Sequence, residues 1–592
     1  MVFFTRIALG MGFWIYFLFL LSTVGFLYRT VVYASTAAVS MVGFILFIIN
    51  RLKQPKLPKQ KLKHLLGEKR VTLSKGLLVT TLVFVLLVLF FHTISPIISW
   101  DANAYHLTIP RLYLENHGFR RIPFNVYSNW PLNIELLFCL SMVMKDYILA
   151  KLVHFLFGLL LIAAIYRFTR SAASPAAGLI ASVLFLCNPV ILFEIKTAYI
   201  DIAYAFFFFI AFVFVHRALE DEKKTNFFIF LAGICCGILA GIKLTGIFGV
   251  FCLTILFVYV RFRKGTRMRS LLKPLLLLVS PSIILLVPWI IKSILLTGNP
   301  VYPFLHSLFG GPEWNSALHA MFSDWQRNIG MGRSLLDYLL LPFRVILLGG
   351  GGSDYTHFGG QINQFWIILI PLSVIIAWRN GMVRRCLGIS LIYFVIWSLT
   401  SQQMRFLISI VPFLSTAAAV SIFDLLSRVK NSRMKSILWM FASVSLSLIL
   451  LLVNITYIKQ GGSMLNRYLR IGSDIKAAAI HPVYHFINNH LPAHARIMML
   501  NTNQGFFCNR EYIADSFFEA SQMNAFLKDQ NTRQGIYKRL KELQISHILL
   551  GNWNMEIQYP PTLFEFLSDS SLSRIIYRSP DGHFLLYKVK NN

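Results

Sequence analysis

Long runs of apolar residues constrain this chain more than any other feature of its sequence. The stretch from Gly76 to Trp100 contains no Asp, Glu, Lys or Arg. As an α-helix rising about 1.5 Å per residue, it exceeds the roughly 30 Å hydrocarbon core of a membrane. Two further apolar runs, near residues 8–28 and 31–49, precede it, and the first is too hydrophobic and too soon followed by another run to be a cleaved signal peptide. The sequence therefore predicts several membrane-spanning helices, and the first two are retained.

The composition excludes a soluble, fibrous or disordered chain. Of the 592 residues, 56% are apolar and 14% are charged, whereas soluble proteins carry about 25% charged residues. The net charge of +31 would also suit nucleic-acid binding, but the Lys and Arg residues lie between apolar runs rather than on one polar face. The seven Cys are scattered and form neither a disulfide framework nor a metal-ligand spacing. We expect a polytopic membrane protein that contacts membrane lipids and binds no nucleic acid.

Basic clusters indicate the orientation of the helices. The linker at residues 51–75 carries nine Lys and Arg residues against one acid, Glu68. Positively charged loops face the cytoplasm, and five later basic clusters lie on the same side if each intervening pair of apolar runs is a helical hairpin. The run 226–260 is too long for one span and divides into two helices at a turn containing Lys243. The count is about thirteen helices, with the N-terminus inside and the C-terminus outside.

The sequence predicts an all-α polytopic membrane fold, and the chain divides into three parts. These are two N-terminal helices with the basic linker (1–75), a transmembrane core (76–459) with outer loops at 99–134 and 297–362, and an outer C-terminal part (460–592). In the C-terminal part, strand-like segments such as RIMMLN and HILLG are interleaved with amphipathic helical segments. We therefore expect a small extracytoplasmic α/β domain at the C-terminus.

The first outer loop contains the strongest candidate site. Asp101 directly follows the Gly76–Trp100 run, at the membrane surface, where an ionised carboxylate is costly. Capping of a helix that begins at Ala102 is an equal alternative, since Asp is a favoured N-cap. Further charged and aromatic residues crowd the same loop: His106, Arg111, Glu115, Arg120, Arg121, Glu135, Trp100, Tyr105, Tyr113, Tyr127 and Trp130. This mixture suits an interfacial site for a charged, amphipathic substrate.

The strings WDANAYHL and NWPLNIELL, at the two ends of this loop, resemble the first extracytoplasmic loop of GT-C glycosyltransferases. The later strings KTAYIDIAYAFFF, IKLTGI, TGNPVYPF and SQQMRFLISIVPFLS are similar to the same group, as is the outer α/β tail. The group includes protein O-mannosyltransferases and the aminoarabinose transferase of lipid A, which take sugars from polyprenyl-phosphate carriers. Two features depart from it. The two leading helices are extra to the common core, and Ala102 stands where the protein O-mannosyltransferases have a second acid.

The resemblance implies a GT-C-like core that moves a sugar from a polyprenyl-phosphate donor to an acceptor hydroxyl at the outer face of a bacterial inner membrane. Such a transfer needs a base for the hydroxyl proton and stabilisation of the departing phosphate. Asp101 is the candidate base, and the resemblance implies inversion by direct displacement. Asp201, at the outer start of a helix, is the second catalytic candidate and would orient the acceptor or hold a cation with Glu135; capping is its alternative.

Lys243 and Arg405 are the first candidates for binding the donor phosphate, because both interrupt apolar sequence at predicted outer helix ends. Snorkelling to the surface is the alternative, although outward cations run against the positive-inside bias. Arg111 is a further phosphate-binding candidate. His106 could bind the carrier phosphate or a metal, and a polar surface residue is its alternative. Glu135 is the candidate ligand of a divalent cation, the one cofactor considered, and a first-turn residue favoured by the helix dipole is its alternative.

Three other classes remain open at this stage. A transporter or lipid flippase would place charges or broken helices at mid-membrane and show two related halves, whereas the notable charges here lie at helix ends on one side. A polysaccharide polymerase or ligase would share the lipid-linked donor but transfer a glycan. A scaffold would use its outer tail to bind a partner. For a glycosyltransferase, the acceptor is a lipid, a glycan or a protein.

Overall fold

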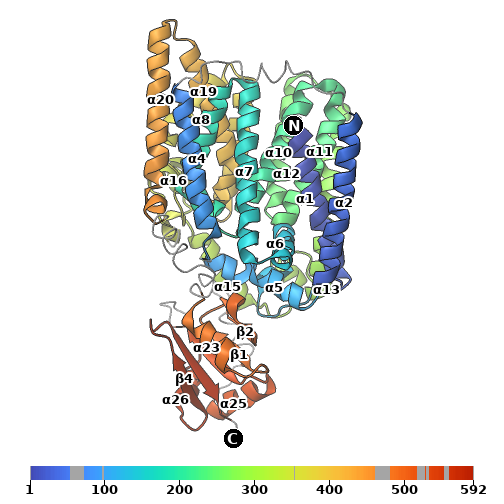
Figure 1. Cartoon of the computed structure of the whole chain (residues 1–592), viewed down its shortest axis with the longest axis vertical. Helices are drawn as coiled ribbons and strands as arrows, with labels where there is room; N and C mark the ends of the chain where they lie inside the picture. The colour runs from blue at the N-terminus through green and yellow to red at the C-terminus, as the bar shows by residue number, and fades with distance from the viewer. Residues whose placement is uncertain are drawn as a thin grey trace.

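The computed structural model describes residues 2–53, 73–96, 99–351, 354–460, 480–515, 527, 532–551 and 559–590. The helices form one bundle, and a small α/β domain lies beyond one end of it (Figure 1). This end, which also carries the short helices α5 (Thr108–Glu115) and α15 (Ser316–Asn328), is called the domain end below. The predicted fold class is confirmed, while most of the basic linker falls outside the described residues.

In the described part of the chain, the bundle contains eleven helices of 17 or more residues and the 12-residue helix α8. They are α1 (Val2–Thr23), α2 (Arg29–Lys53), α4 (Leu73–Ile94), α7 (Tyr147–Ala172), α8 (Pro175–Leu186), α10 (Asp201–Glu220), α11 (Thr225–Ile242), α12 (Gly246–Arg263), α13 (Met268–Thr297), α18 (Gly381–Leu399), α19 (Val411–Ser427) and α20 (Ser432–Val453). Basic clusters of different hairpins meet at the end opposite the domain. There, Arg385 Nη1 lies 2.5 Å from Glu220 Oε1, and Arg261 Nη1 lies 3.3 Å from Glu222 Oε1.

Among the described residues, ten helices are long and apolar enough to cross a membrane, or eleven if α8 and α9 (Pro189–Ile195), which meet at an 82° bend, count as one span. The expected count of about thirteen is higher. The short apolar helices α6 (Asn133–Met144) and α17 (Trp366–Ala377) have 12 residues each. At about 1.5 Å per residue they cover only about 18 Å, less than a hydrocarbon core. The chain is an integral membrane protein with its spans in one bundle.

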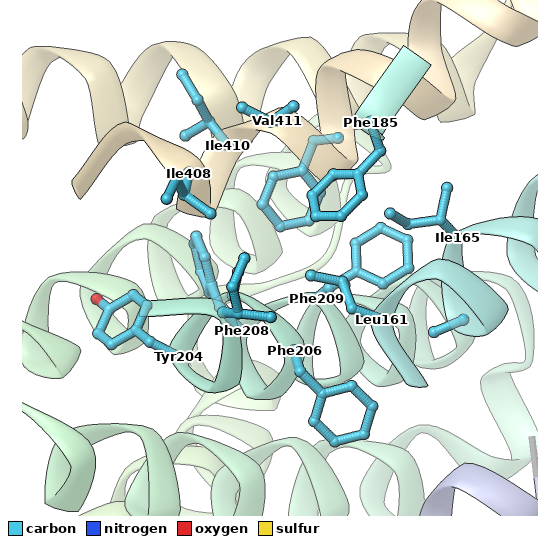
Figure 2. Packing of buried hydrophobic residues seen from close by; sticks show 14 of the residues in the cluster. Leu161, Ile165, Phe185, Tyr204, Phe206, Phe208, Phe209, Ile408, Ile410 and Val411 are labelled. Carbon is cyan, nitrogen blue, oxygen red and sulfur yellow. The ribbon is translucent and has the colours of Figure 1, made fainter. Parts of the chain in front are cut away.

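Helix α10 is the centre of the bundle. Its apolar span is 89% buried inside the protein, more than any other candidate span among the described residues. Figure 2 shows Phe208 and Phe209 of α10 between residues of α7, such as Leu161, and Ile408 of the segment that precedes α19. Because lipid tails are as apolar as these side chains, close packing rather than escape from water stabilises such a helix. The packing fixes α10 against the segment that carries Arg405.

Short elements cover the domain end of the bundle. The first outer region contains the π-helical turn η1 (Ala102–His106), α5 and the 3₁₀ turn η2 (Val126–Asn129). The second contains α14 (His306–Phe309), α15, α16 (Leu335–Leu347) and the 3₁₀ turn η4 (Tyr355–His357). The 3₁₀ segment η5 (Met404–Ile410) leads directly into α19. Both polar regions expected from the sequence therefore lie at the same end.

The turn between α1 and α2 is attached to the first outer region. Leu27 N donates to His117 O and Phe119 N donates to Ser22 O, each at 2.8 Å. Gly118 makes this approach possible, because a Cβ atom there would lie 2.4 Å from the carbonyl oxygen of Ser22. Helices α1 and α2 are thus docked through their connecting turn onto the loop that follows α4.

The C-terminal domain contains a five-stranded sheet with the order β2-β1-β3-β5-β4. Its elements are α23 (Pro482–His490), β1 (Arg496–Leu500), the 3₁₀ turn η7 (Gly505–Phe507), β2 (Glu511–Ala514), α25 (Arg533–Glu542), β3 (His547–Gly551), α26 (Pro561–Ser568), β4 (Ser573–Arg578) and β5 (Phe584–Val589). Strand β1 pairs in parallel with β2 and β3, whereas β5 is antiparallel to β3 and β4. The expected α/β character of the domain is confirmed.

Candidate active site

Asp101 lies just before η1, at the domain end. Its Oδ2 accepts hydrogen bonds from Arg405 Nη1 of η5 and from Tyr105 Oη at 2.9 Å. The two charged side chains are about one-fifth exposed. No side-chain capping bond links Asp101 to η1, and its backbone is already helical. The capping alternative is therefore wrong for Asp101, and its carboxylate faces a cation.

A second ion pair lies beside the first. Lys243 Nζ, in the turn between α11 and α12, lies 3.7 Å from Asp201 Oδ1 at the start of α10. Asp201 makes no capping bond either, because Ile200 holds the N-cap position. The ring of Phe406 joins the pairs, since Lys243 Nζ lies 3.4 Å and the Arg405 guanidinium 5.4 Å from its centroid. Two acids and two cations from four separate elements therefore form one cluster.

Burial and charge set the ionisation of this cluster. Burial raises the pKa of Asp101, but the Arg405 guanidinium and the hydrogen bonds from Arg405 and Tyr105 lower it, and the net pKa lies below its usual value. Asp101 is thus an anion at neutral pH. Burial, opposed by the Asp201 carboxylate, lowers the pKa of Lys243 to about 8. Lys243 is therefore a cation that loses its proton in mildly alkaline solution.

Glu194 of α9 was not singled out from the sequence. It is 1% exposed and interacts electrostatically with both ion pairs. Its Oε2 atom is buried and has no hydrogen-bond partner among the described residues. A lone carboxylate in the apolar string VILFEI is the signal that could have identified it. The cluster thus contains three acids and two cations.

His106 and Glu135 form a neighbouring buried pair. His106 Nδ1 lies 2.7 Å from Glu135 Oε1, and the two residues are 3% and 2% exposed. The rings of Tyr105 and Tyr199 lie 4.2 and 5.4 Å from the His106 ring, and Tyr199 also lies beneath the Arg405 guanidinium at 5.6 Å. The pair therefore packs next to the charged cluster through the rings of Tyr105 and Tyr199, and both His106 and Glu135 are buried.

Arg111 lies apart from this cluster. Its Nε atom donates to Glu115 Oε1 at 2.7 Å, and its Nη atoms donate to the backbone carbonyls of Phe506 and Cys508 in the outer domain. Nearby, Asn103 Nδ2 donates to Gln504 Oε1 at 3.0 Å. These bonds connect the first outer region to the loop that follows β1, so the outer domain is fixed directly next to Asp101.

No group of three or more His, Cys, Asp and Glu side chains in the described part of the chain has the arrangement of a metal site. Glu135, the candidate metal ligand, instead contacts His106 through one oxygen, while its buried Oε2 atom has no hydrogen-bond partner in the described part of the chain. The acids of the cluster already face Arg405 and Lys243. The donor set as it stands fits an anion opposite these cations better than a divalent cation.

The helical bundle, with a small α/β domain beyond one end, is the fold of a polytopic membrane protein, and solved structures of similar fold identify it as a GT-C fold. The crystal structure of ArnT from Cupriavidus metallidurans bound to undecaprenyl phosphate is similar to this chain, with a TM-score of 0.57 and 13% identity over 86% of this chain and 97% of that one. Apo ArnT gives a TM-score of 0.55 and 12% identity, over 87% of this chain and 98% of that one.

Two sequence families match parts of the chain. Residues 125–412 match a domain of unknown function (DUF8201). Residues 350–502, which include Arg405, match the Alg9-like mannosyltransferase family. Comparison with curated protein sequences finds no match. The resemblance to GT-C glycosyltransferases expected from the sequence is confirmed at the level of the fold.

Proposed function

We propose that the protein transfers a sugar from a polyprenyl-phosphate carrier to an acceptor hydroxyl at the outer face of a bacterial inner membrane. The observation that carries the proposal is the convergence of Asp101, Asp201, Lys243 and Arg405 at the ends of buried helices. The fold of ArnT, solved with undecaprenyl phosphate, and the Alg9-like match over residues 350–502 support the same activity. The acceptor is a lipid, a glycan or a protein.

Arg405 and Lys243 would bind the phosphate of the donor. Both contact the ring of Phe406, so a single phosphate group could reach the two cations together. As the glycosidic bond breaks, negative charge grows on the departing phosphate, and fixed cations stabilise this charge without reorganising. The planar guanidinium of Arg405 is suited to bind two phosphate oxygens at once.

Asp101 would act as the base that accepts the proton of the acceptor hydroxyl. In the free protein its carboxylate is paired with Arg405, which makes it a weak base. A donor phosphate that takes over Arg405 would remove this neighbouring cation, and the pKa of Asp101 would rise toward a more basic value. Donor binding would therefore prepare the base. Attack from the side opposite the phosphate would invert the sugar carbon, and Asp201 would orient the acceptor.

The isoprenoid tail of the donor needs an apolar path beside these cations. A small hollow between α12 and α18 is lined mainly by apolar and aromatic side chains, among them Phe248, Tyr393, Trp397 and Phe406. Since Phe406 also contacts Lys243, this hollow adjoins the proposed phosphate site. The hollow itself, about 20 Å³, is too small for an isoprene unit, so it marks only an apolar side of the proposed phosphate site.

The direct test uses the purified full chain in detergent, a panel of synthetic polyprenyl-phosphate sugars and a bacterial membrane extract as acceptor. We expect one donor to release polyprenyl phosphate, and an Asp101→Asn protein to release none above background. Donor binding without bond cleavage in the unmutated protein, with every donor and with the extract present, would instead indicate a transporter.

A further inference from the structure

A cavity of about 640 Å³ opens at the domain end, away from the charged cluster. It lies among the α1–α2 turn, α5, the turn between α6 and α7, and η7 of the outer domain. Its volume is in the range of small-molecule sites in proteins. Of the residues considered for the donor site, Arg111 is the one that lines it. The α1–α2 turn and the start of α2 supply three of its lining residues, Tyr28, Arg29 and Thr30.

Two cations at the cavity have no partner among the described residues. Arg29, at the start of α2, and Lys145, after α6, both line the cavity, and neither side chain makes a hydrogen bond or an ion pair with another described residue. The two acids that line it are already engaged. Glu115 is paired with Arg111, and Asp146 accepts from the amides of Ile148 and Leu149 at the start of α7. With Arg29, Arg111 and Lys145 against Glu115 and Asp146, the lining of the cavity carries one net positive charge.

The remaining walls are suited to an apolar chain. Leu114, Met142 and Phe506 line the cavity together with the ring of Tyr28, which stacks on His117 with 3.9 Å between centroids. Beside it, Val24 and Phe26 of the α1–α2 turn are 54% and 56% exposed. Exposed apolar residues at the end of two apolar helices belong in the membrane interface rather than in water. A ligand at this position would reach the cations from the bilayer.

We propose that this cavity binds the phosphate headgroup of an anionic membrane lipid through Arg29 and Lys145. Phosphate is the anion that such unpaired cations at a membrane surface would attract, and the apolar walls would hold the start of an acyl chain. The site is separate from the Asp101 cluster and does not depend on the proposed transfer reaction. It gives the two extra helices a function, because the α1–α2 turn supplies one of the two cations.

The test measures lipid binding to the delipidated full chain by native mass spectrometry, with phosphatidylglycerol as the probe. Each cation near a membrane surface contributes about fivefold to binding, so the variant Arg29→Gln with Lys145→Gln should bind this lipid about 25-fold more weakly. The charge-preserving variant Arg29→Lys with Lys145→Arg should restore most of the affinity. A matched control, Lys223→Gln with Lys224→Gln at the opposite end of the bundle, should bind normally.

Three outcomes would overturn the proposal. They are equal binding by the double Gln variant, equal loss in the control, and binding of inorganic phosphate as tight as that of the lipid, which would indicate a soluble anion. An Arg405→Ala protein separates this site from the donor site. It should lose polyprenyl-phosphate binding and keep phosphatidylglycerol binding. Loss of both lipids in Arg405→Ala would place the phosphatidylglycerol at the donor site and would contradict a second site.

Discussion

Arg405 Nη1 donates a hydrogen bond to Asp101 Oδ2, so two residues 304 positions apart in the chain form an ion pair at the domain end of the bundle. Asp101 follows the first span of the core, and Arg405 leads into α19. Each charge keeps the other from being an isolated ion at a membrane boundary, where such an ion is costly. Substitution of either residue therefore affects both.

Replacing Asp101 by Asn should abolish sugar transfer and leave donor binding nearly unchanged or slightly stronger. Asn keeps the size of the side chain but cannot accept the hydroxyl proton, and loss of general base catalysis typically costs about 10²–10⁴-fold in rate. Removal of the carboxylate also frees Arg405 for phosphate. Single-turnover transfer and donor binding are measured on the same preparation.

The control for this substitution is Asp424→Asn, because Asp424 also pairs with an arginine, Arg428, but near the opposite end of the bundle. It should transfer sugar normally. Near-normal turnover of the Asp101→Asn protein would remove Asp101 from the mechanism and direct attention to Asp201 and Glu194.

Replacing Arg405 by Lys should slow transfer about ten- to hundredfold, with a smaller change in donor affinity. The charge is kept, but the planar fork that binds phosphate is lost, and one such contact in the transition state is worth about this factor or more. Arg405→Ala should be slower still. The measurement is single-turnover transfer beside a binding assay for the same donor, with Arg428→Lys as the matched control.

The Arg405 series also distinguishes the possible roles of this residue. Equal loss of affinity and rate in the Lys protein would mean that Arg405 anchors the donor in the ground state. Unchanged kinetics in both variants would mean that it serves only the structure.

Transfer should decline as the pH rises through about 8. Burial lowers the pKa of Lys243 to about 8, so Lys243 is a cation below this pH and neutral above it. The pH dependence of kcat/KM reports groups of the free enzyme, and in the Lys243→Arg protein the decline should move to higher pH. Lys196, whose pKa burial also lowers to about 8, is the alternative source. A decline that stays near pH 8 in Lys243→Arg would exclude Lys243.

The outer domain and the turn between α19 and α20 should lie on opposite sides of the membrane. All seven Cys are buried, so cysteines introduced at exposed positions, Ala493→Cys in the domain and Lys430→Cys in the turn, can be labelled selectively. In intact cells, a membrane-impermeant thiol reagent should modify the first and not the second. The reverse pattern would invert the orientation and place the charged cluster in the cytoplasm.

Much of the fold could be predicted from the sequence because apolar runs mark helices directly. The strand-like segments RIMMLN and HILLG form β1 and β3, whereas the edge strand β2 has only four residues, and so short a segment has no clear alternation of apolar and polar residues. The helix α26 was missed. Whether a segment is helical depends on its local composition and can be predicted from the sequence. The number of membrane spans is harder to predict, because it also depends on how far a short helix such as α6 extends into the membrane.

The sequence indicates four of the five members of the charged cluster, all at predicted helix ends, but it does not indicate which of them pair. Asp101, Asp201, Lys243 and Arg405 each interrupt apolar sequence, and this is a local signal. The pairing of Asp101 with Arg405 depends on which helices are neighbours in the bundle, which no periodicity reveals. Glu194 was missed because its burial comes from the surrounding helices rather than from the composition of its own short segment.

The π-helical turn η1 restricts how many residues the chain can have between Asp101 and the contact with the C-terminal domain. Its closing bond runs from Leu107 N to Ala102 O at 2.8 Å, five residues apart rather than four, which amounts to one residue inserted into a helical turn. Asp101, directly before this turn, faces Arg405, while Asn103 within the turn donates to Gln504 of the C-terminal domain. In a helix each residue advances the side-chain direction by about 100°. Deleting Ala102, the residue between Asp101 and Asn103, would rotate one of these two side chains away from its partner, so one of the two contacts would be lost. The number of residues in this turn is therefore fixed by both contacts.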